Sequence, residues 1–193
     1  MKTIKYIFLS ILSLALFTNC SNDDDNNDPE PINEEEVITT LKLTLVPQAG
    51  GDTITFTTQD LDGDGPNIPV VTVSGDLVAG SSYLGTVQVL NELENPAEDI
   101  TLEVLEEDED HQFFYTFSNN SDVSVTYTDQ DENGNPVGVS FMLSTNAAST
   151  GDTLTVILKH EPNKTAQGVS DGDITNAGGE TDAEASFTFD VVN

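Results

Sequence analysis

The chain has 193 residues, with 35 aspartates and glutamates against 5 lysines, no arginine, and a formal net charge of −30. Because residues 1–20 contain two of the lysines and no acid, the remainder carries 3 basic and 35 acidic residues. A field of that sign repels phosphate backbones and leaves no basic patch to release their counterions, which excludes nucleic-acid binding. The partners that remain are cations, neutral solutes and other proteins.

The first element expected along the chain is a secretory signal. Lys2 and Lys5 precede an apolar run from Ile7 to Phe17, and Cys20 follows shortly after it. The run is shorter than the roughly 20 apolar residues of a spanning helix, and polar sequence follows at once. Cys20 is the only cysteine, so it has no internal disulfide partner. We therefore predict a signal peptide over residues 1–19 and a lipid, such as palmitate, on Cys20.

The residues around this cysteine carry a resemblance to known export signals. Phe17-Thr18-Asn19-Cys20 resembles a bacterial lipobox. Ser21-Asn22-Asp23-Asp24-Asp25 resembles the acidic signal that carries lipoproteins of the Bacteroidetes to the outer face of the outer membrane. The resemblance implies a lipid-anchored protein of the outer membrane that is exposed at the cell surface. Acidic and polar residues without apolar periodicity continue to Glu36, so residues 20–36 are predicted to form a disordered tether.

The remaining residues, 37–193, are predicted to form one domain. Apolar residues alternate with a period of two through most of this region, as in half-buried strands. Leu41, Leu43 and Leu45, for example, share one face of the first strand. About ten short strands and no convincing amphipathic helix predict an all-β fold, a single β-sandwich of Ig-like or jelly-roll-like type. After the first strand, the others are expected over 53–58, 70–73, 84–90, 100–105, 112–117, 123–128, 138–144, 153–160 and 184–191.

One of these segments fits two structures. Between residues 96 and 110, Ile100, Val104 and Leu105 suit a strand but also face one way on a short helix. In the helical interpretation, Asn95 serves as the cap and Pro96 lies in the first turn. The sequence leaves both structures open.

An acidic loop follows the second strand. Asp60, Asp62 and Asp64 place oxygen ligands at alternate positions, and Gly65 follows at the sixth, as in the first half of a calcium-binding loop. The bidentate glutamate of a full EF-hand is replaced by Val71, so an EF-hand is not predicted. Two interpretations remain, a shortened calcium site completed by another segment and a solvated turn.

His111 and His160 are the only histidines, and each lies at a strand end beside acids. Asp110 precedes His111, and Glu161 follows His160. A neutral imidazole nitrogen together with carboxylates binds zinc and other transition metals. We therefore take His111, His160, Asp110 and Glu161 as candidate ligands of one metal ion, provided that the two strand ends meet. Two unrelated histidines at the rim of the sandwich are the alternative.

The residues from Glu161 to Thr181 show no strand period and form a loop longer than compact domains usually contain without a role in binding. Within this loop, Gly168-Val169-Ser170-Asp171-Gly172 matches the nucleophile pattern Gly-x-Ser-x-Gly. The strand before the serine and the helix after it, which that chemistry requires, are both missing from the pattern. No enzyme is predicted.

Several segments are similar to uncharacterised surface lipoproteins of the Bacteroidetes, which are often accompanied by TonB-dependent receptors. Some of those proteins carry the label of a type 1 periplasmic binding fold, which alternates strands and helices, whereas this chain follows a strand pattern. The resemblance implies an accessory protein that captures a solute or metal, and it brings no catalytic residues. The similar segments are 60–65, 83–85, 90–92, 110–115 and 160–164.

These observations predict a lipid-anchored cell-surface protein that captures a metal ion or a small metal complex for uptake across the outer membrane. The candidate ions are zinc and calcium, and the candidate partners are the membrane and a TonB-dependent receptor. The alternative is a structural or adhesive lipoprotein whose Asp60–Gly65 loop is stiffened by calcium. Thr53 and Thr153 also lie in a pattern that resembles the O-glycosylation sequence of the Bacteroidetes, with their occupancy left open.

Overall fold

The computed structural model describes residues 36–63, 65–118 and 121–193. The predicted signal peptide, Cys20, Asp64 and all of the predicted tether except Glu36 lie outside these residues. Residues Glu35–Asn193 form one compact unit, which contains both sheets described below. In the part of the chain that is described, no helix has the length and apolarity needed to cross a bilayer.

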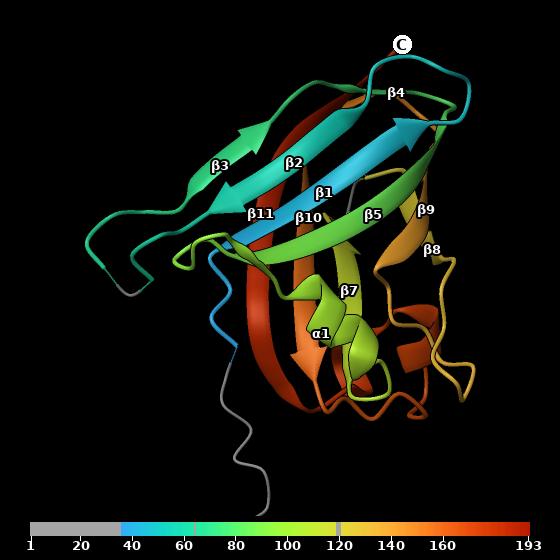
Figure 1. The fold of residues 1–193 in the computed structure, drawn as a ribbon. Helices are drawn as coiled ribbons and strands as arrows, with labels where there is room; N and C mark the ends of the chain where they lie inside the picture. Colours follow the sequence, from blue (N-terminus) through green and yellow to red (C-terminus); the bar gives the residue numbers. More distant parts are fainter. Residues whose placement is uncertain (1–35, 64, 119–120) are drawn as a thin grey trace, which may run out of the picture. The chain divides into compact units, whose positions relative to one another are not determined.

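Two β-sheets pack against each other, which confirms the predicted all-β sandwich (Figure 1). The order of strands in the larger sheet is β3-β2-β1-β5-β9-β8, with β6 paired to β5, and in the smaller sheet it is β4-β11-β10-β7. All neighbouring strands are antiparallel except β4 and β11. The larger sheet contains β1 (Thr40–Pro47), β2 (Ile54–Gln59), β3 (Val70–Val73), β5 (Ser82–Asn91), β6 (Glu98–Asp99), β8 (Val123–Tyr127) and β9 (Ser140–Thr145). The smaller sheet contains β4 (Leu77–Val78), β7 (His111–Phe117), β10 (Ser149–His160) and β11 (Glu180–Val192).

The core lies between the sheets and follows the period-two pattern. Leu43 of β1, Phe56 of β2 and Phe187 of β11 are fully buried. The ring of Phe56 lies 5.6 Å from the rings of both Phe187 and Phe189, centroid to centroid. Residues that alternate along the sequence therefore meet across the sandwich, and their burial supplies the main driving force for the fold.

Residues 100–105 do not form the predicted strand. The helix α1 (Thr101–Glu106) occupies this position, so the strand interpretation is wrong and the helical one is correct. Ile100 and Val104 are both buried, and their spacing of four residues places them on one face of a helix. The predicted cap is also wrong, because Ile100 rather than Asn95 stands at the N-cap, without a capping side chain.

The long segment after His160 folds back over β7. It contains two short 3-10 helices, η1 (Val169–Asp171) and η2 (Ile174–Asn176). Val169 and Ala177 pack with Phe114 in a small second core. Because this segment covers the outer face of β7 while the sandwich covers the inner one, all residues from His111 to Tyr115 are buried.

Candidate metal centre

The two histidines lie side by side at the ends of neighbouring strands. His111 opens β7, His160 closes β10, and the two are partners in the strand register. Cross-strand partners project from the same face of a sheet, so their side chains are adjacent. The imidazole rings are stacked, with centroids 4.8 Å apart and an interplanar angle of 8°. The predicted metal site requires these two strand ends to meet, and in the structure they do.

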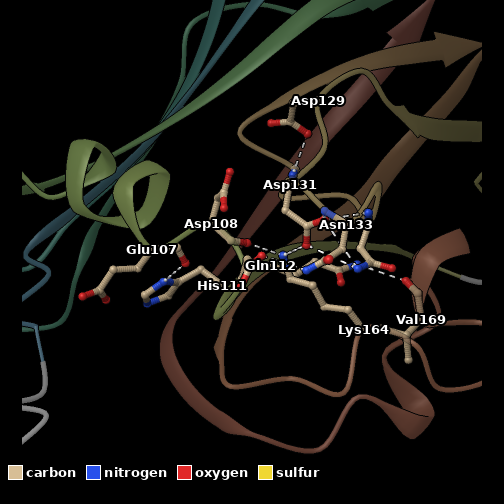
Figure 2. Close-up of polar contacts among 12 residues, drawn as sticks. Glu107, Asp108, His111, Gln112, Asp129, Asp131, Asn133, Lys164 and Val169 are labelled. Carbon is tan, nitrogen blue, oxygen red and sulfur yellow. Dashed lines mark hydrogen bonds and ion pairs between the residues drawn. The ribbon is translucent and has the colours of Figure 1, made fainter.

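A hydrogen bond fixes the tautomer of His111. Its Nδ1 lies 3.1 Å from the backbone oxygen of Glu107, at the C-terminal end of α1 (Figure 2). A carbonyl oxygen can only accept, so Nδ1 carries the proton of this bond. His111 is fully buried, and its Nε2 has no hydrogen-bond partner among the residues that the structure describes. In the neutral ring, Nε2 therefore presents an unshared electron pair.

Two carboxylates approach this nitrogen from different segments. The Oε1 atom of Glu36 lies 3.7 Å from Nε2 of His111, and Oδ2 of Asp182 lies 3.8 Å from it. Both separations exceed a hydrogen bond. The side chains of Glu36 and Asp182 are only 12% and 10% exposed.

These groups leave an unusual concentration of unpartnered atoms. Among the described residues, four buried side-chain nitrogen or oxygen atoms have no hydrogen-bond partner. Three of the four belong to the groups just described, namely Glu36 Oε2, His111 Nε2 and Asp182 Oδ2. Because buried polar atoms are nearly always hydrogen-bonded, such a concentration calls for a specific explanation.

Asp182 reaches this position because β11 contains a bulge. Leu158 pairs with Ala183 and Lys159 pairs with Thr181, which leaves Asp182 as an extra residue without a partner on β10. In an uninterrupted strand, Asp182 would face away from the core, since Ala183 and Ala185 face toward it. An extra residue re-aims the side chains around it, and here Asp182 belongs to the same group as the histidines.

The end of β10 also requires a glycine. Gly179 has a φ of +64°, and a Cβ atom built on it would lie 2.2 Å from the backbone oxygen of His160. Only glycine allows the chain to pass this close to the second histidine before β11 begins.

Burial makes both carboxylates less acidic. Desolvation, followed by the charge of Asp182, raises the pKa of Glu36 to about 7. Desolvation also raises the pKa of Asp182, although His160 and His111 act in the opposite direction. The carboxylates are therefore held in a position that disfavours their negative charge unless a cation joins them.

The donor atoms are close enough to share an ion. One set of groups, His111, His160 and Asp182, and a second, Glu36, Glu107 and His111, each offer ligand atoms within 4.8 Å of one another. A tetrahedral ion bound at about 2.0–2.2 Å places its ligands about 3.4 Å apart. The observed separations of 3.7 and 3.8 Å around Nε2 are a few tenths of an ångström longer.

The other residues expected from the sequence lie elsewhere. Asp110 and Glu161 are exposed, and their contact is a backbone hydrogen bond of 2.7 Å from the nitrogen of Glu161 to the oxygen of Asp110. In the acidic loop, Asp60 accepts a hydrogen bond from the backbone nitrogen of Asp62, and Asp62 accepts from both nitrogens of Asn67. Asp64 lies outside the described residues, and neither Asp60 nor Asp62 belongs to the two groups above.

A second buried polar cluster lies across β7 from the histidines. Lys164 and Asp131 are 5% and 4% exposed, and their Nζ and Oδ2 atoms are 3.1 Å apart. Lys164 also donates to the backbone oxygen of Asp108 (Figure 2). Asp131 accepts from the backbone nitrogens of Asn133 and Asn135 at 3.0 and 2.8 Å. The ammonium of Lys164 and the carboxylate of Asp131 therefore both have partners, as expected of an ion pair that stabilises the fold.

Comparisons with family models, curated proteins and solved structures found no match for this chain.

Proposed function

We propose that this protein binds a divalent transition-metal ion through His111, His160, Asp182 and Glu36. The observation that carries the proposal is that His111, Asp182 and Glu36, from three segments of the chain, lie side by side, and that each has a buried polar atom without a hydrogen-bond partner among the described residues. An ion bound by the group of His111, His160 and Asp182 would satisfy Nε2 of His111 and Oδ2 of Asp182 together, and a carboxylate oxygen of Glu36 lies 3.7 Å from the same Nε2. The ion would also compensate the desolvation that opposes the negative charge of the two carboxylates.

The donor set favours particular ions. Two imidazoles with carboxylates suit zinc or copper(II), whereas calcium takes oxygen ligands alone. Copper(I) favours thiolate and thioether ligands, and the only cysteine, Cys20, lies outside the described residues. We therefore expect zinc and copper(II) to bind, with copper(II) the tighter of the two, and calcium to bind weakly.

We propose capture of the bare ion rather than of a metal complex, and capture rather than catalysis. A recess of about 200 Å³ reaches Asp182. Pockets that hold organic ligands and substrates usually enclose about 300–1,000 Å³. A hydrated ion fits a recess of this size, which supports capture of the bare ion.

The cellular setting of this function is also a proposal, and its support comes from the sequence outside the described residues. An apolar signal that ends at Cys20 and an acidic stretch directly after it support a lipid anchor at the outer membrane, exposed at the cell surface. An ion held there would be available to an outer-membrane receptor of the TonB-dependent type, which we propose as the partner in uptake.

Calorimetric titration of a chain that begins at Ser21 tests the binding. This chain contains the whole compact unit Glu35–Asn193. We expect one zinc ion per chain and a loss of binding in Asp182→Asn and in His160→Asn. The matched control is Asp76→Asn, since Asp76 is exposed and lines a hollow beside Pro47, at the end of β1 far from the histidines.

Zinc binding that is equally strong in Asp182→Asn and in the parent chain would contradict the proposed site. Calcium binding without zinc binding would also contradict it, and would support instead a calcium site with a structural role in the acidic loop at Asp60.

A further inference from the structure

A recess opens on the surface beside the candidate metal centre. It lies between the start of β1, the end of β2 and the start of β11, and its volume is about 200 Å³. Thr58 and Asp60 line it from the side of β2, and Asp182 and Glu184 line it from β11. Asp182 and Glu184 belong to the smaller sheet, Thr58 belongs to the larger one and Asp60 directly follows β2, so the recess lies between the two layers of the sandwich.

One side chain belongs to both the recess and the metal centre. The side chain of Asp182 is 90% buried and lines the recess, and its Oδ2 atom has no hydrogen-bond partner within the described part of the chain. The same carboxylate groups with His111 and His160 as a possible ligand set. A cation in the recess would therefore lie beside the residue whose carboxylate groups with the two imidazoles.

We propose that this recess is the port through which a hydrated divalent cation reaches the histidines. The proposal rests on the proposed metal binding and adds the route. Asp60 and Glu184 contribute negative charge to the lining, and the whole chain carries a net charge of −30. Charges of one sign around a concave, low-dielectric site concentrate the oppositely charged ion and increase its association rate.

The alternative route is a larger acidic hollow formed by residues 105–110 and Glu132. Its acids include Glu107, which belongs to the second ligand group. However, none of the buried unpartnered atoms among the described residues belongs to a side chain that lines it. Of the two hollows, the recess at Asp182 is therefore the one lined by a side chain that carries a buried, unpartnered oxygen.

Obstruction of the port provides the first test. Ile54 and Phe56 face the core, so Thr58 faces the same side of β2 and Thr57 the opposite side. Thr58→Trp is therefore designed to fill the recess, and Thr57→Trp is the matched control. We expect Thr58→Trp to slow zinc association and dissociation by the same factor in stopped-flow competition with a chelating dye. Its equilibrium affinity should stay within about twofold, since a narrowed route changes a barrier and not the bound state.

A charge substitution provides a second test that does not depend on how the tryptophan packs. Asp60→Asn removes a charge that lines the recess, whereas Asp62→Asn removes a charge from the same loop that does not line it. We expect Asp60→Asn alone to slow association about two- to threefold at low ionic strength. The difference should vanish at 1 M salt, where the screening length is about 3 Å.

The outcomes separate the route from the binding itself. Association rates unchanged in both Thr58→Trp and Asp60→Asn would overturn the port while leaving metal binding intact. A weakened affinity at an unchanged association rate would show that Thr58 affects the fold of the site, and it would also overturn the port. Absence of zinc binding in the parent chain would refute the proposed function, and the port with it.

Discussion

Two buried polar clusters flank the start of β7, and they differ in whether their polar atoms have partners. Lys164 and Asp131 form an ion pair in which the ammonium also bonds a backbone oxygen and the carboxylate accepts from two backbone nitrogens. His111 instead faces two carboxylates at distances beyond a hydrogen bond. The first cluster is complete without a ligand, whereas the second is not. This contrast separates a structural role from a binding role within a few residues of the same strand.

The largest expected effect comes from breaking the complete cluster. Lys164→Met removes the cation and leaves Asp131 buried without it, which should lower the free energy of unfolding by about 3–5 kcal/mol. Urea denaturation of the chain that begins at Ser21 measures this. Zinc affinity should stay unchanged, because Lys164 belongs to neither ligand group. A zinc affinity that fell together with stability would show that the two clusters are one unit.

The matched control is Lys159→Met. Lys159 donates to the oxygen of Gly179 and the hydroxyl of Thr181 at an exposed position. Its loss should cost less than about 1 kcal/mol. A cost equal to that of Lys164→Met would remove the distinction between the buried and the exposed lysine.

The next largest effect is the increase in the free energy of unfolding when zinc binds to the cluster around His111. At a free concentration 100 times its dissociation constant, zinc should raise the free energy of unfolding by about 2.7 kcal/mol. Thermal or urea denaturation with and without zinc measures this gain. Asp182→Asn should abolish most of it, whereas Lys164→Met should retain it on its lower baseline. Equal gains in the parent chain and Asp182→Asn would place the ion elsewhere.

The smallest effect is a difference in pH dependence between the two clusters. Glu36 has a folded-state pKa of about 7 against 4.5 for the free group, so between these values the folded chain holds a proton that the unfolded chain lacks. Its contribution therefore makes the metal-free protein less stable as pH rises from about 4.5 to 7. Glu36→Gln should flatten this part of the profile, as measured by urea denaturation at several pH values. A profile that keeps the same slope in Glu36→Gln would contradict the assignment.

Asp131 should have the opposite pH dependence. Burial alone raises its pKa, but hydrogen bonds from Asn135 and Lys164 outweigh burial and lower the pKa below the usual 3.8. Its stabilising contribution is therefore present above pH 3.8 and is lost as the pH falls through the lowered value. The complete cluster weakens in acid, whereas the incomplete one weakens toward neutral pH unless a metal ion is bound.

Local sequence patterns predict most of the sandwich, because alternation along a strand reports directly on burial. Leu41, Leu43 and Leu45 illustrate this rule. The pattern is ambiguous for Ile100–Leu105, where a spacing of four residues suits a helix as well. Strands of two residues, such as β4 and β6, are too short to produce any period.

Sequence patterns predict only part of the candidate site. The sequence pattern places His111 and His160 at strand ends on the core-facing side but leaves open whether those ends meet, because the pairing of β7 with β10 has no local signal. The pattern does not predict Asp182, because it faces the site through a bulge that no period reveals. The sequence predicts Glu36 to belong to the tether because its neighbours are acidic and polar, although its side chain lies against His111. Such contacts depend on strand register and on chain reversal, which are set by the whole fold.

The most direct test of the account is a long-range proton–nitrogen correlation spectrum of the two imidazoles in the metal-free and zinc-loaded chain. The chain has only two histidines, so both ring patterns can be assigned. We predict that His111 is a neutral ring with its proton on Nδ1, and that both rings shift together and saturate at one equivalent of zinc. A doubly protonated His111 between Glu36 and Asp182, with both rings unchanged by zinc, would contradict the account and identify the cluster as a buried ion pair.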